Sequence, residues 1–465
     1  MKLSKLTFAV VLGLALSACS NMSNDGSLDQ AKQTYQNYQD ITKQFSVDEQ
    51  WWHGYNDLQL NELVEQAIKN NLDLAKSAIA VNRALYNANL VGANLVPTFS
   101  GSASSSASKG VGSSNNTNSV GTSTVTNTAS FNLSYTIDLW RRLADSASAA
   151  EWEHKATQDD LKAARLSLIN SVVATYYQIA YYKDAIAVTN RTIKNYEQIS
   201  NILNNKLKVG AIDPLAVEQA QQATLSARNS VVGLATSLKT AEQTMRNLLN
   251  LQPNQPLPSR YPNILNVKLQ GVDTNVPVSA IANRPDVAMR LNRLQSAFKT
   301  LTATEKSWFP TLTLGGAISG SARSASNVAD NPIANGVFSF DLPFLDWNRV
   351  KNNVKISEAD YTTARMNYEQ TITSALNEID SYYYTYNQSR SSFDLLEQTY
   401  EKNRKITTYY QNRYNQGVAE FRDWISAMNT ELSSQIALLN QKYTILMNEN
   451  LVYQAMAGKF QLSAK

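Results

Sequence analysis

The chain has 465 residues and a formal net charge of +4, and 17% of its residues are charged. This balance is too close to neutral to favour a nucleic-acid partner or an anionic surface. Cys19 is the only cysteine, which excludes an intramolecular disulfide, so the fold must rest on burial alone.

Residues 1–18 have the pattern of a secretory signal peptide. Two lysines precede an apolar stretch of about ten residues, which is too short to span a bilayer as a helix. The stretch ends in the letters LSAC, a bacterial lipobox pattern, which predicts cleavage before Cys19 and lipid attachment to its thiol. The alternative is an ordinary signal peptide next to a bystander cysteine. Ser20 follows instead of aspartate, which favours the outer membrane over the inner one.

A first repeat is expected over residues 58–251, after a lipid-anchored N-terminal segment over 19–57. It should open with a helix over 58–94, which Pro97 ends. A β-hairpin over 98–138 follows, with its tip near 113–118. Its second strand alternates apolar and small polar residues, which is period two over a length that can cross a membrane as a tilted strand. The apolar set is Val125, Ala129, Phe131, Leu133, Tyr135 and Ile137.

A long helix is predicted over 143–208, because seam residues recur at alternating spacings of four and three. A period of 3.5 held over more than five heptads indicates a coiled coil. At about 1.5 Å per residue this helix would be roughly 100 Å long. Gly210 should end it, and Asp213 followed by Pro214 should begin a returning helix over 214–250.

The same order recurs after a proline-rich linker over 252–277. Residues 131–142 (FNLSYTIDLWRR) correspond to 338–349 (FSFDLPFLDWNR) at an interval of 207, which also takes Gly210 to Gly417. The sequence therefore predicts a second repeat over 278–465. Its elements are a helix (278–309), a β-hairpin (311–342), a long helix (350–416) and a returning helix (420–458).

Patterns that carry catalysis are scarce in this sequence. Two histidines, His53 and His154, offer little for a metal cluster or a histidine-based nucleophile. We therefore expect no enzyme activity, no cofactor and no metal site.

The two hairpins predict that the chain assembles with copies of itself. Four strands cannot close a membrane barrel, which needs about eight, and open edges in lipid would leave backbone groups unpaired. Two, three or four copies would give eight, twelve or sixteen strands, and a working pore favours three or four.

The mature chain resembles the TolC-like outer-membrane factors, especially the lipoprotein branch (NodT-like) that serves resistance-nodulation-division efflux pumps. The resemblance rests on the order of its motifs along both repeats. These are the lipobox Cys19, Trp51-Trp52 before Asp57, the segment 70–74 (NNLDL), the segment 283–287 (NRPDV), Phe309-Pro310 and the turn glycines.

The resemblance implies a mixed α/β membrane protein. It would be a homotrimer with one twelve-stranded outer-membrane β-barrel, four strands per chain, continuing into a long periplasmic α-helical coiled-coil tunnel. The resemblance also implies a passive outer-membrane exit duct of a tripartite drug efflux pump in a Gram-negative bacterium. The expected partners are a periplasmic adaptor (membrane fusion) protein, an inner-membrane pump and outer-membrane lipid, with no nucleic acid.

The family's helix turns carry Arg, three residues, Gly, two residues and Ser, and then Leu-Asp, and this chain matches that pattern in part. The second turn has Arg413, Gly417 and Asp423, with Glu420 and Arg422 in place of serine and leucine. The first turn has Lys206, Gly210 and, at the serine position, Asp213. The resemblance places adaptor docking or gating at these residues, altered in detail.

Two other functions remain open. The chain could serve as the outer-membrane duct of a type I protein-secretion system, which the lipobox and Trp51-Trp52 disfavour. It could also be a coiled-coil structural protein with its serine-rich segments as linkers.

Overall fold

A computed structural model describes residues 26–109 and 123–462. The expected signal peptide, Cys19, Ser20 and the first hairpin tip lie outside these residues. The chain divides into two compact units. Unit 1 contains residues 80–158 and 289–369 with part of the N-terminus, and unit 2 contains 34–79, 159–288 and 370–465.

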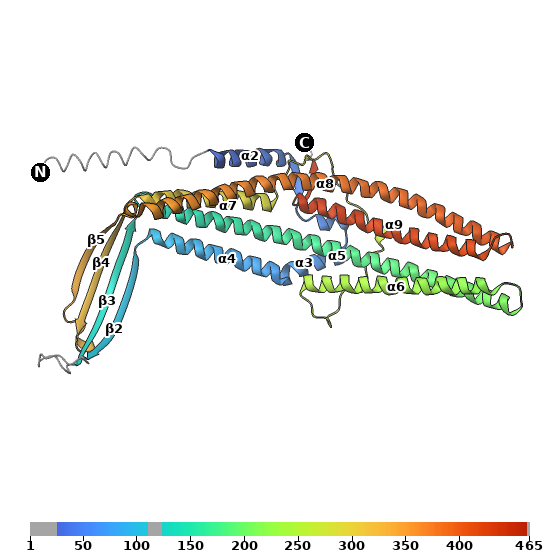
Figure 1. Ribbon diagram of the computed structural model, residues 1–465, viewed down its shortest axis with the longest axis horizontal. Coiled ribbons are helices and arrows are strands. Elements are labelled where there is room, and N and C mark those ends of the chain that lie inside the picture. Colours follow the sequence, from blue (N-terminus) through green and yellow to red (C-terminus); the bar gives the residue numbers. More distant parts are fainter. Residues whose placement is uncertain (1–25, 110–122, 463–465) are drawn as a thin grey trace. The chain divides into compact units, whose positions relative to one another are not determined.

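The helices and strands occur in an order that repeats once along the chain (Figure 1). The N-terminal elements are α2 (Ser27–Thr42) and β1 (Phe45–Asp48). The first repeat contains α3 (Leu58–Asn70), α4 (Leu72–Gly92), β2 (Thr98–Lys109), β3 (Ser123–Ile137), α5 (Arg142–Lys208) and α6 (Pro214–Leu249). The second contains α7 (Pro285–Glu305), β4 (Thr311–Ala322), β5 (Ile333–Asp341), α8 (Trp347–Asn415) and α9 (Phe421–Ala455), and β6 (Lys459–Leu462) follows.

The long helices have nearly equal lengths, 67 residues for α5 and 69 for α8. Their returning partners α6 and α9 have 36 and 35 residues. Of the helices that the structure describes, none is both long enough and apolar enough to cross a membrane.

Unit 1 contains one antiparallel sheet in the order β2-β3-β4-β5 (Figure 1). Its register aligns large apolar side chains across neighbouring strands. Leu133 of β3 pairs with Phe99 of β2. Phe131 of β3 pairs with Ile318 of β4, the neighbouring strand at the other edge of β3. Phe338 and Phe340 of β5 pair with Leu314 and Leu312. Because paired residues share a face, one face of the sheet is apolar, and Phe338 on it is 75% exposed.

The opposite face of the sheet carries small hydroxyl groups that bond across the strands. The Ser102 and Ser130 hydroxyls lie 2.9 Å apart, and those of Ser104 and Thr128 lie 2.7 Å apart. The two faces therefore differ as the alternation in the sequence predicted.

The core of unit 2 gathers parts of the chain that are distant in sequence. Trp51 is fully buried, and its indole nitrogen donates to Asn450 Oδ1 at 2.8 Å. Tyr55 donates to Glu449 Oε2 at 2.9 Å. Nearby, β1 and β6 pair as antiparallel strands, with Val47 opposite Phe460. These contacts join the segment that follows α2 to the C-terminal part of the described chain.

The predicted helix over 58–94 is wrong as a single element, because the chain breaks at Asn71. The Asn71 backbone is extended, with ψ of 123°, which ends α3. Its side-chain oxygen then accepts hydrogen bonds from the backbone N–H groups of Asp73 and Leu74, both at 3.0 Å. This is an N-cap, so the same asparagine ends one helix and starts the next.

The predicted helix over 278–309 is also too long, since α7 starts only at Pro285. Proline is favoured in the first turn of a helix and disfavours helical backbone in the residue before it.

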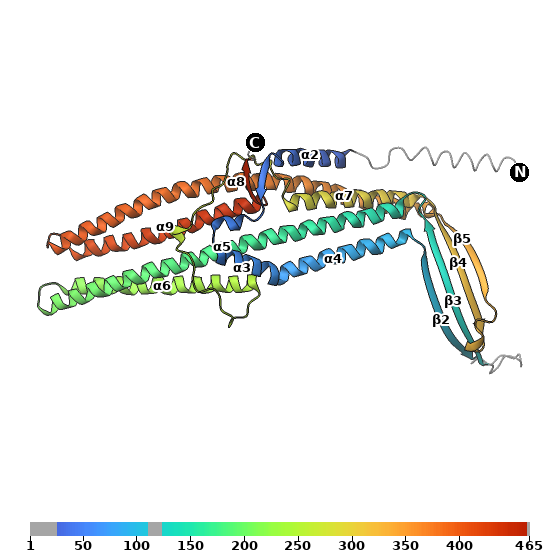
Figure 2. The same cartoon turned by 180° about the vertical axis from the view of Figure 1, so that it is seen from behind.

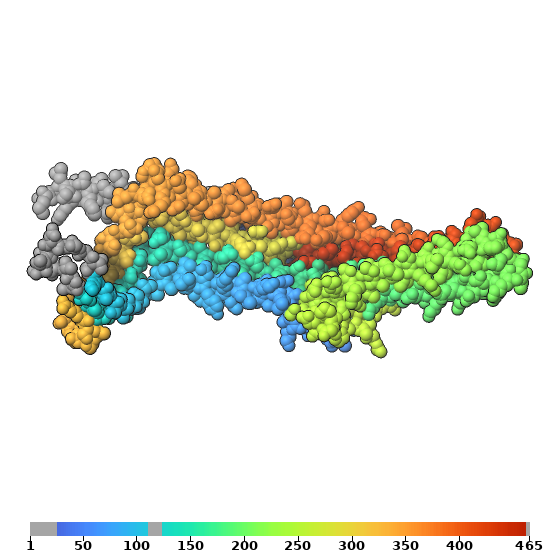
Figure 3. All heavy atoms as spheres, turned by 60° about the horizontal axis from the view of Figure 1, so that its bottom comes forward, coloured from blue at the N-terminus to red at the C-terminus, as the bar shows by residue number. Residues whose placement is uncertain are grey.

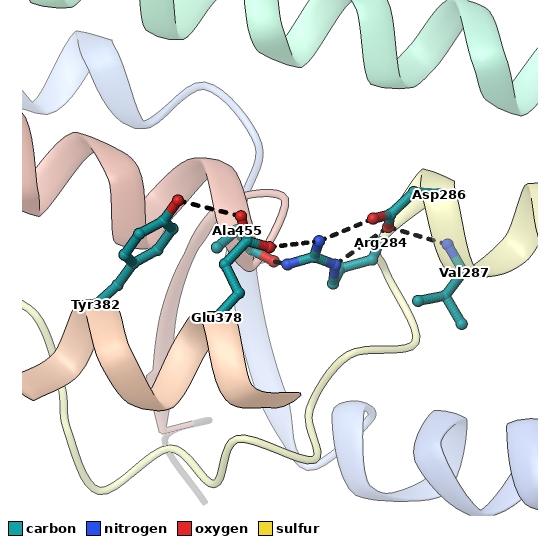
Figure 4. Close-up of polar contacts among 6 residues, drawn as sticks. All are labelled: Arg284, Asp286, Val287, Glu378, Tyr382 and Ala455. Atoms are coloured by element: carbon teal, nitrogen blue, oxygen red, sulfur yellow. Dashed lines mark hydrogen bonds and ion pairs between the residues drawn. The ribbon is translucent and has the colours of Figure 1, made fainter. Parts of the chain in front are cut away.

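The residue before this proline, Arg284, joins three segments of unit 2 (Figure 4). Its guanidinium binds Asp286 through two nitrogens, at 3.1 and 2.8 Å. It also donates to Glu378 of α8 at 2.7 Å and to the Ala455 carbonyl at the end of α9 at 2.8 Å. Burial alone would lower the pKa of Arg284, but the two carboxylates raise it. The guanidinium therefore stays charged and holds the start of α7 against α8 and α9.

Candidate functional site at the two helical turns

Two tight turns join the long helices to their returning partners, and both lie in unit 2 (Figure 2). Gly210 and Gly417 have φ of +68° and +74°, which side-chain-bearing residues rarely adopt. At the first turn Ala211 N–H bonds to Lys206 O at 2.9 Å, and at the second Val418 N–H bonds to Arg413 O at 3.0 Å. Both helices thus end in the same Schellman motif.

The helices that follow the turns begin differently. Asp213 accepts a hydrogen bond from Leu215 N–H at 2.6 Å, and Pro214 occupies the first turn, so α6 has a capped start. Glu420 holds the equivalent N-cap position before α9, but its side chain makes no capping bond. The Glu420 carboxylate is 3.4 Å from Arg422 instead.

The charged side chains of the second turn form a small exposed network. Arg422 lies between Glu420 and Asp423, at 3.4 and 3.8 Å. Arg413 donates to the Tyr409 hydroxyl at 2.9 Å and to the Val418 carbonyl at 3.3 Å. Arg413 therefore supports the turn itself, while Arg422 connects the two acids at its surface. Exposed pairs of this kind are worth little in stability, so their charges remain available to a partner.

Aromatic side chains connect the two turns. The Lys206 ammonium nitrogen lies 5.1 Å from the centroid of the Tyr414 ring. Tyr414 in turn packs on Phe421 at 5.6 Å and on Trp424 at 5.4 Å. The sequence analysis gave Phe421 and Trp424 no role. The position of both residues within a few residues of Gly417 is the signal that could have identified them.

Below the turns, the two helical hairpins, α5 with α6 and α8 with α9, share one apolar core. From the first hairpin it includes Tyr196, Leu203 and Val217, and from the second Phe421, Trp424 and Ile425. The Tyr196 hydroxyl also donates to Asn429 Oδ1 at 2.8 Å. A shift of one hairpin must therefore disturb the other.

The turn surfaces also expose apolar side chains. Val209 and Leu215 flank the first turn and are 79% and 60% exposed, and Val418 at the second is 56% exposed. In the space-filling view α6 forms a continuous surface up to this end of the hairpin, in green (Figure 3).

The structure brings the predicted turn residues into two neighbouring groups: Lys206, Gly210 and Asp213 at the first turn, and Arg413, Gly417, Glu420, Arg422 and Asp423 at the second. Within residues 26–109 and 123–462, no group of acidic, histidine or cysteine side chains is arranged to hold a metal ion. The arrangement offers charged and apolar contact groups on a shared core.

Comparison with known proteins identifies close relatives. A family model described as "Outer membrane efflux protein" matches residues 63–251 and 276–458. The chain is 52% identical over 460 residues to "Toxin and drug export protein A" of Aggregatibacter actinomycetemcomitans, and the match covers 99% of each chain. It is 24% identical to "Probable outer membrane lipoprotein SilC" of Salmonella typhimurium, over 88% of this chain and 87% of that one. The crystal structure of the outer membrane protein VceC from Vibrio cholerae superimposes with a TM-score of 0.79 at 21% identity, over 90% of this chain and all of that one.

Proposed function

Because the chain belongs to the outer membrane efflux protein family, we propose that three copies of it form the outer-membrane exit duct of a tripartite drug efflux pump. The duct conducts substrates passively from a periplasmic adaptor and an inner-membrane pump to the exterior. The single observation that carries this proposal is the four-stranded sheet with one apolar face.

The sheet supports assembly through its edges as well as its face. Within the described residues β2 pairs only with β3 and β5 only with β4, so each has an edge without a partner strand. In lipid such edges would leave N–H and C=O groups unbonded at a cost of several kcal/mol each. If β2 of one copy pairs with β5 of the next, three sheets close into twelve strands, which leaves room for a pore.

The helical turns support docking of an adaptor protein at this part of unit 2. Val209, Leu215 and Val418 offer apolar contact, and the exposed Arg422 with its two acidic neighbours offers charge complementarity. A partner that contacts both turns would also act on the core that the two hairpins share. Docking and opening of the duct would then be coupled.

Lipid attachment at Cys19 is part of the proposal. The support is the lipobox pattern in the sequence. An anchored N-terminus would keep each copy at the membrane before its strands insert.

The test is a deletion strain in a Gram-negative host that expresses the matching adaptor and pump. Loss of the chain should raise susceptibility to several unrelated drugs, and a plasmid copy should restore resistance. A copy that lacks residues 123–137, and therefore β3, should be expressed but should not restore resistance. Unchanged susceptibility in the deletion strain, with the pump shown to be active, would contradict the proposal.

A further inference from the structure

Trp140 connects the two central strands of the sheet at the end where they meet the helices. Its ring stacks on Phe309 with 4.8 Å between the centroids, and its indole nitrogen donates to the Pro310 carbonyl at 2.9 Å. Trp140 follows β3, and Phe309-Pro310 precedes β4, the strand that pairs with β3. The contact therefore ties the end of one strand to the start of its neighbour.

The chain carries both halves of this contact a second time. An interval of 207 residues takes Trp140 to Trp347, which follows β5. An interval of 213 relates Pro97, which precedes β2, to Pro310. Each of these prolines comes after a short 3₁₀ helix and one extended residue, with ψ of 157° at Val96 and 149° at its equivalent. The entry into a strand is thus built in the same way in both repeats.

Within one chain the second pair cannot meet, because β5 and β2 are the two opposite edges of the sheet. Trp347 is 54% exposed, and Val96 is 57% exposed. The Trp347 ring lies near Lys351 of its own helix, whose ammonium nitrogen is 5.8 Å from the ring centroid. Two exposed apolar side chains at equivalent places on opposite edges fit a neighbouring copy that is related by rotation.

We propose that Trp347 of one copy packs on Val96 of the next copy and donates its indole N–H to the Pro97 carbonyl there. This contact sets the register of β5 against β2 of the next copy. The inference rests on the proposed function, because it names how neighbouring copies of the duct join. Val96 lacks the ring that Phe309 supplies within the chain, so the junction between copies has no stacked pair and is the weaker of the two.

The two intervals also give the register of the strands between copies. Asn132 of β3 pairs with Ala317 of β4. Their equivalents are Ser339 of β5 and Ser104 of β2, so these two serines should lie opposite each other across the boundary. A slip of one residue would turn every side chain of a strand to the other face, whereas this register keeps the hydroxyl groups on one face.

This register continues the rows of side chains that the sheet already shows. Inside one chain Thr313 lies opposite Ser339. Thr128 lies opposite Ser104, with the two hydroxyls 2.7 Å apart. The proposed register joins these two pairs into one row of four hydroxyl side chains across the boundary. On the apolar face it places the exposed Phe340 ring opposite an alanine of β2, where a large ring has room.

Disulfide linkage between copies tests the register. In the double variant Ser339→Cys with Ser104→Cys, the opposed Cα atoms should lie about 4.5–5.5 Å apart, which a disulfide spans. Mild oxidation of isolated outer membranes should link this variant into dimers and trimers on denaturing gels without reductant. The matched control joins Ser339→Cys with Ser108→Cys, about 13 Å further along β2, and should link at least tenfold less. Each single variant reports any linkage through Cys19, the only native cysteine.

An added aromatic ring tests the tryptophan contact. Val96→Phe supplies the ring that Phe309 has in the other repeat. It should slow dissociation of the purified full-length trimer in nonionic detergent about two- to tenfold, the effect of one aromatic pair. In a Trp347→Ala background the same substitution should give no gain. Leu345→Ala removes a side chain of the same junction that is 72% exposed, and in that background the gain from Val96→Phe should remain.

Equal linkage of the two cysteine pairs would overturn the register, and an equal gain from Val96→Phe with and without Trp347 would overturn the contact. The second result would fit a tryptophan that contacts lipid headgroups instead of a neighbouring chain. Either result in a chain that restores drug resistance would leave the proposed function intact. A wild-type chain that neither assembles nor restores resistance would remove both.

Discussion

Lys206 and Tyr414 bring the two repeats together at their turns, with the ammonium nitrogen 5.1 Å from the ring centroid. Lys206 corresponds to Arg413 in the second repeat, but Arg413 faces Tyr409 of its own helix, at 5.5 Å. Equivalent cations therefore serve different purposes. One stabilises a turn, and the other bridges two hairpins.

We expect Lys206→Met to increase the open fraction of the duct. An exposed cation–π contact contributes about 0.5–1 kcal/mol, so its loss should shift an open–closed equilibrium about two- to fivefold. Single-channel conductance of the purified chain in planar lipid bilayers measures this fraction. Lys208→Met removes a cation of the same turn that lies outside this contact, and it should leave the conductance unchanged. Equal behaviour of the two variants would contradict the bridging role.

We expect Arg284→Met to destabilise unit 2 by about 2 kcal/mol, because it removes charged hydrogen bonds to Asp286 and Glu378 and one to the Ala455 carbonyl. The loss is moderated because water can reach both carboxylates, which are 37% and 38% exposed. Arg284→Lys should recover only part of it, since an ammonium lacks the planar fork. Denaturant unfolding followed by circular dichroism measures the change. Arg349→Met breaks an exposed pair with Asp346 and should have little effect.

We expect Glu449→Gln to reduce the loss of stability as pH rises. Burial raises the pKa of Glu449, although Gly271 N–H and the Tyr55 hydroxyl bond to its carboxylate. A carboxyl whose folded pKa exceeds its unfolded value contributes stability below the unfolded value and loses it as pH rises through the folded one. The melting temperature of the variant, taken relative to that of the wild type, should therefore rise between mildly acidic and neutral pH. A constant difference at every pH would argue against titration of Glu449.

We expect Cys19→Ser to abolish labelling of the chain with radioactive palmitate, because serine offers no thiol for the lipid. Ser20→Asp should keep the label but move the chain from the outer-membrane fraction to the inner one after density-gradient separation. Labelling of the Cys19→Ser chain would exclude the lipobox assignment. Outer-membrane location of the Ser20→Asp chain would exclude the sorting rule.

Local chemistry explains which parts of the candidate site could be predicted. Gly210 and Gly417 end their helices because glycine adopts positive φ without strain, and Asp213 caps α6 because a short carboxylate reaches its own downstream N–H. Glu420 has one more methylene and a nearby Arg422, and it pairs with that side chain instead of capping. The break at Asn71 was missed because the apolar pattern continues across it.

The sequence by itself determined the duplicated order of elements, the two faces of the sheet and the positions of both turns. These features depend on periodicity and on the backbone preferences of single residues, which act over a few positions along the chain. Only the tertiary structure decided that Arg284 joins Glu378 to Ala455, that Lys206 meets Tyr414, and that Trp140 stacks on Phe309. Those contacts depend on how helices pack side by side, and packing brings together residues that no local pattern relates.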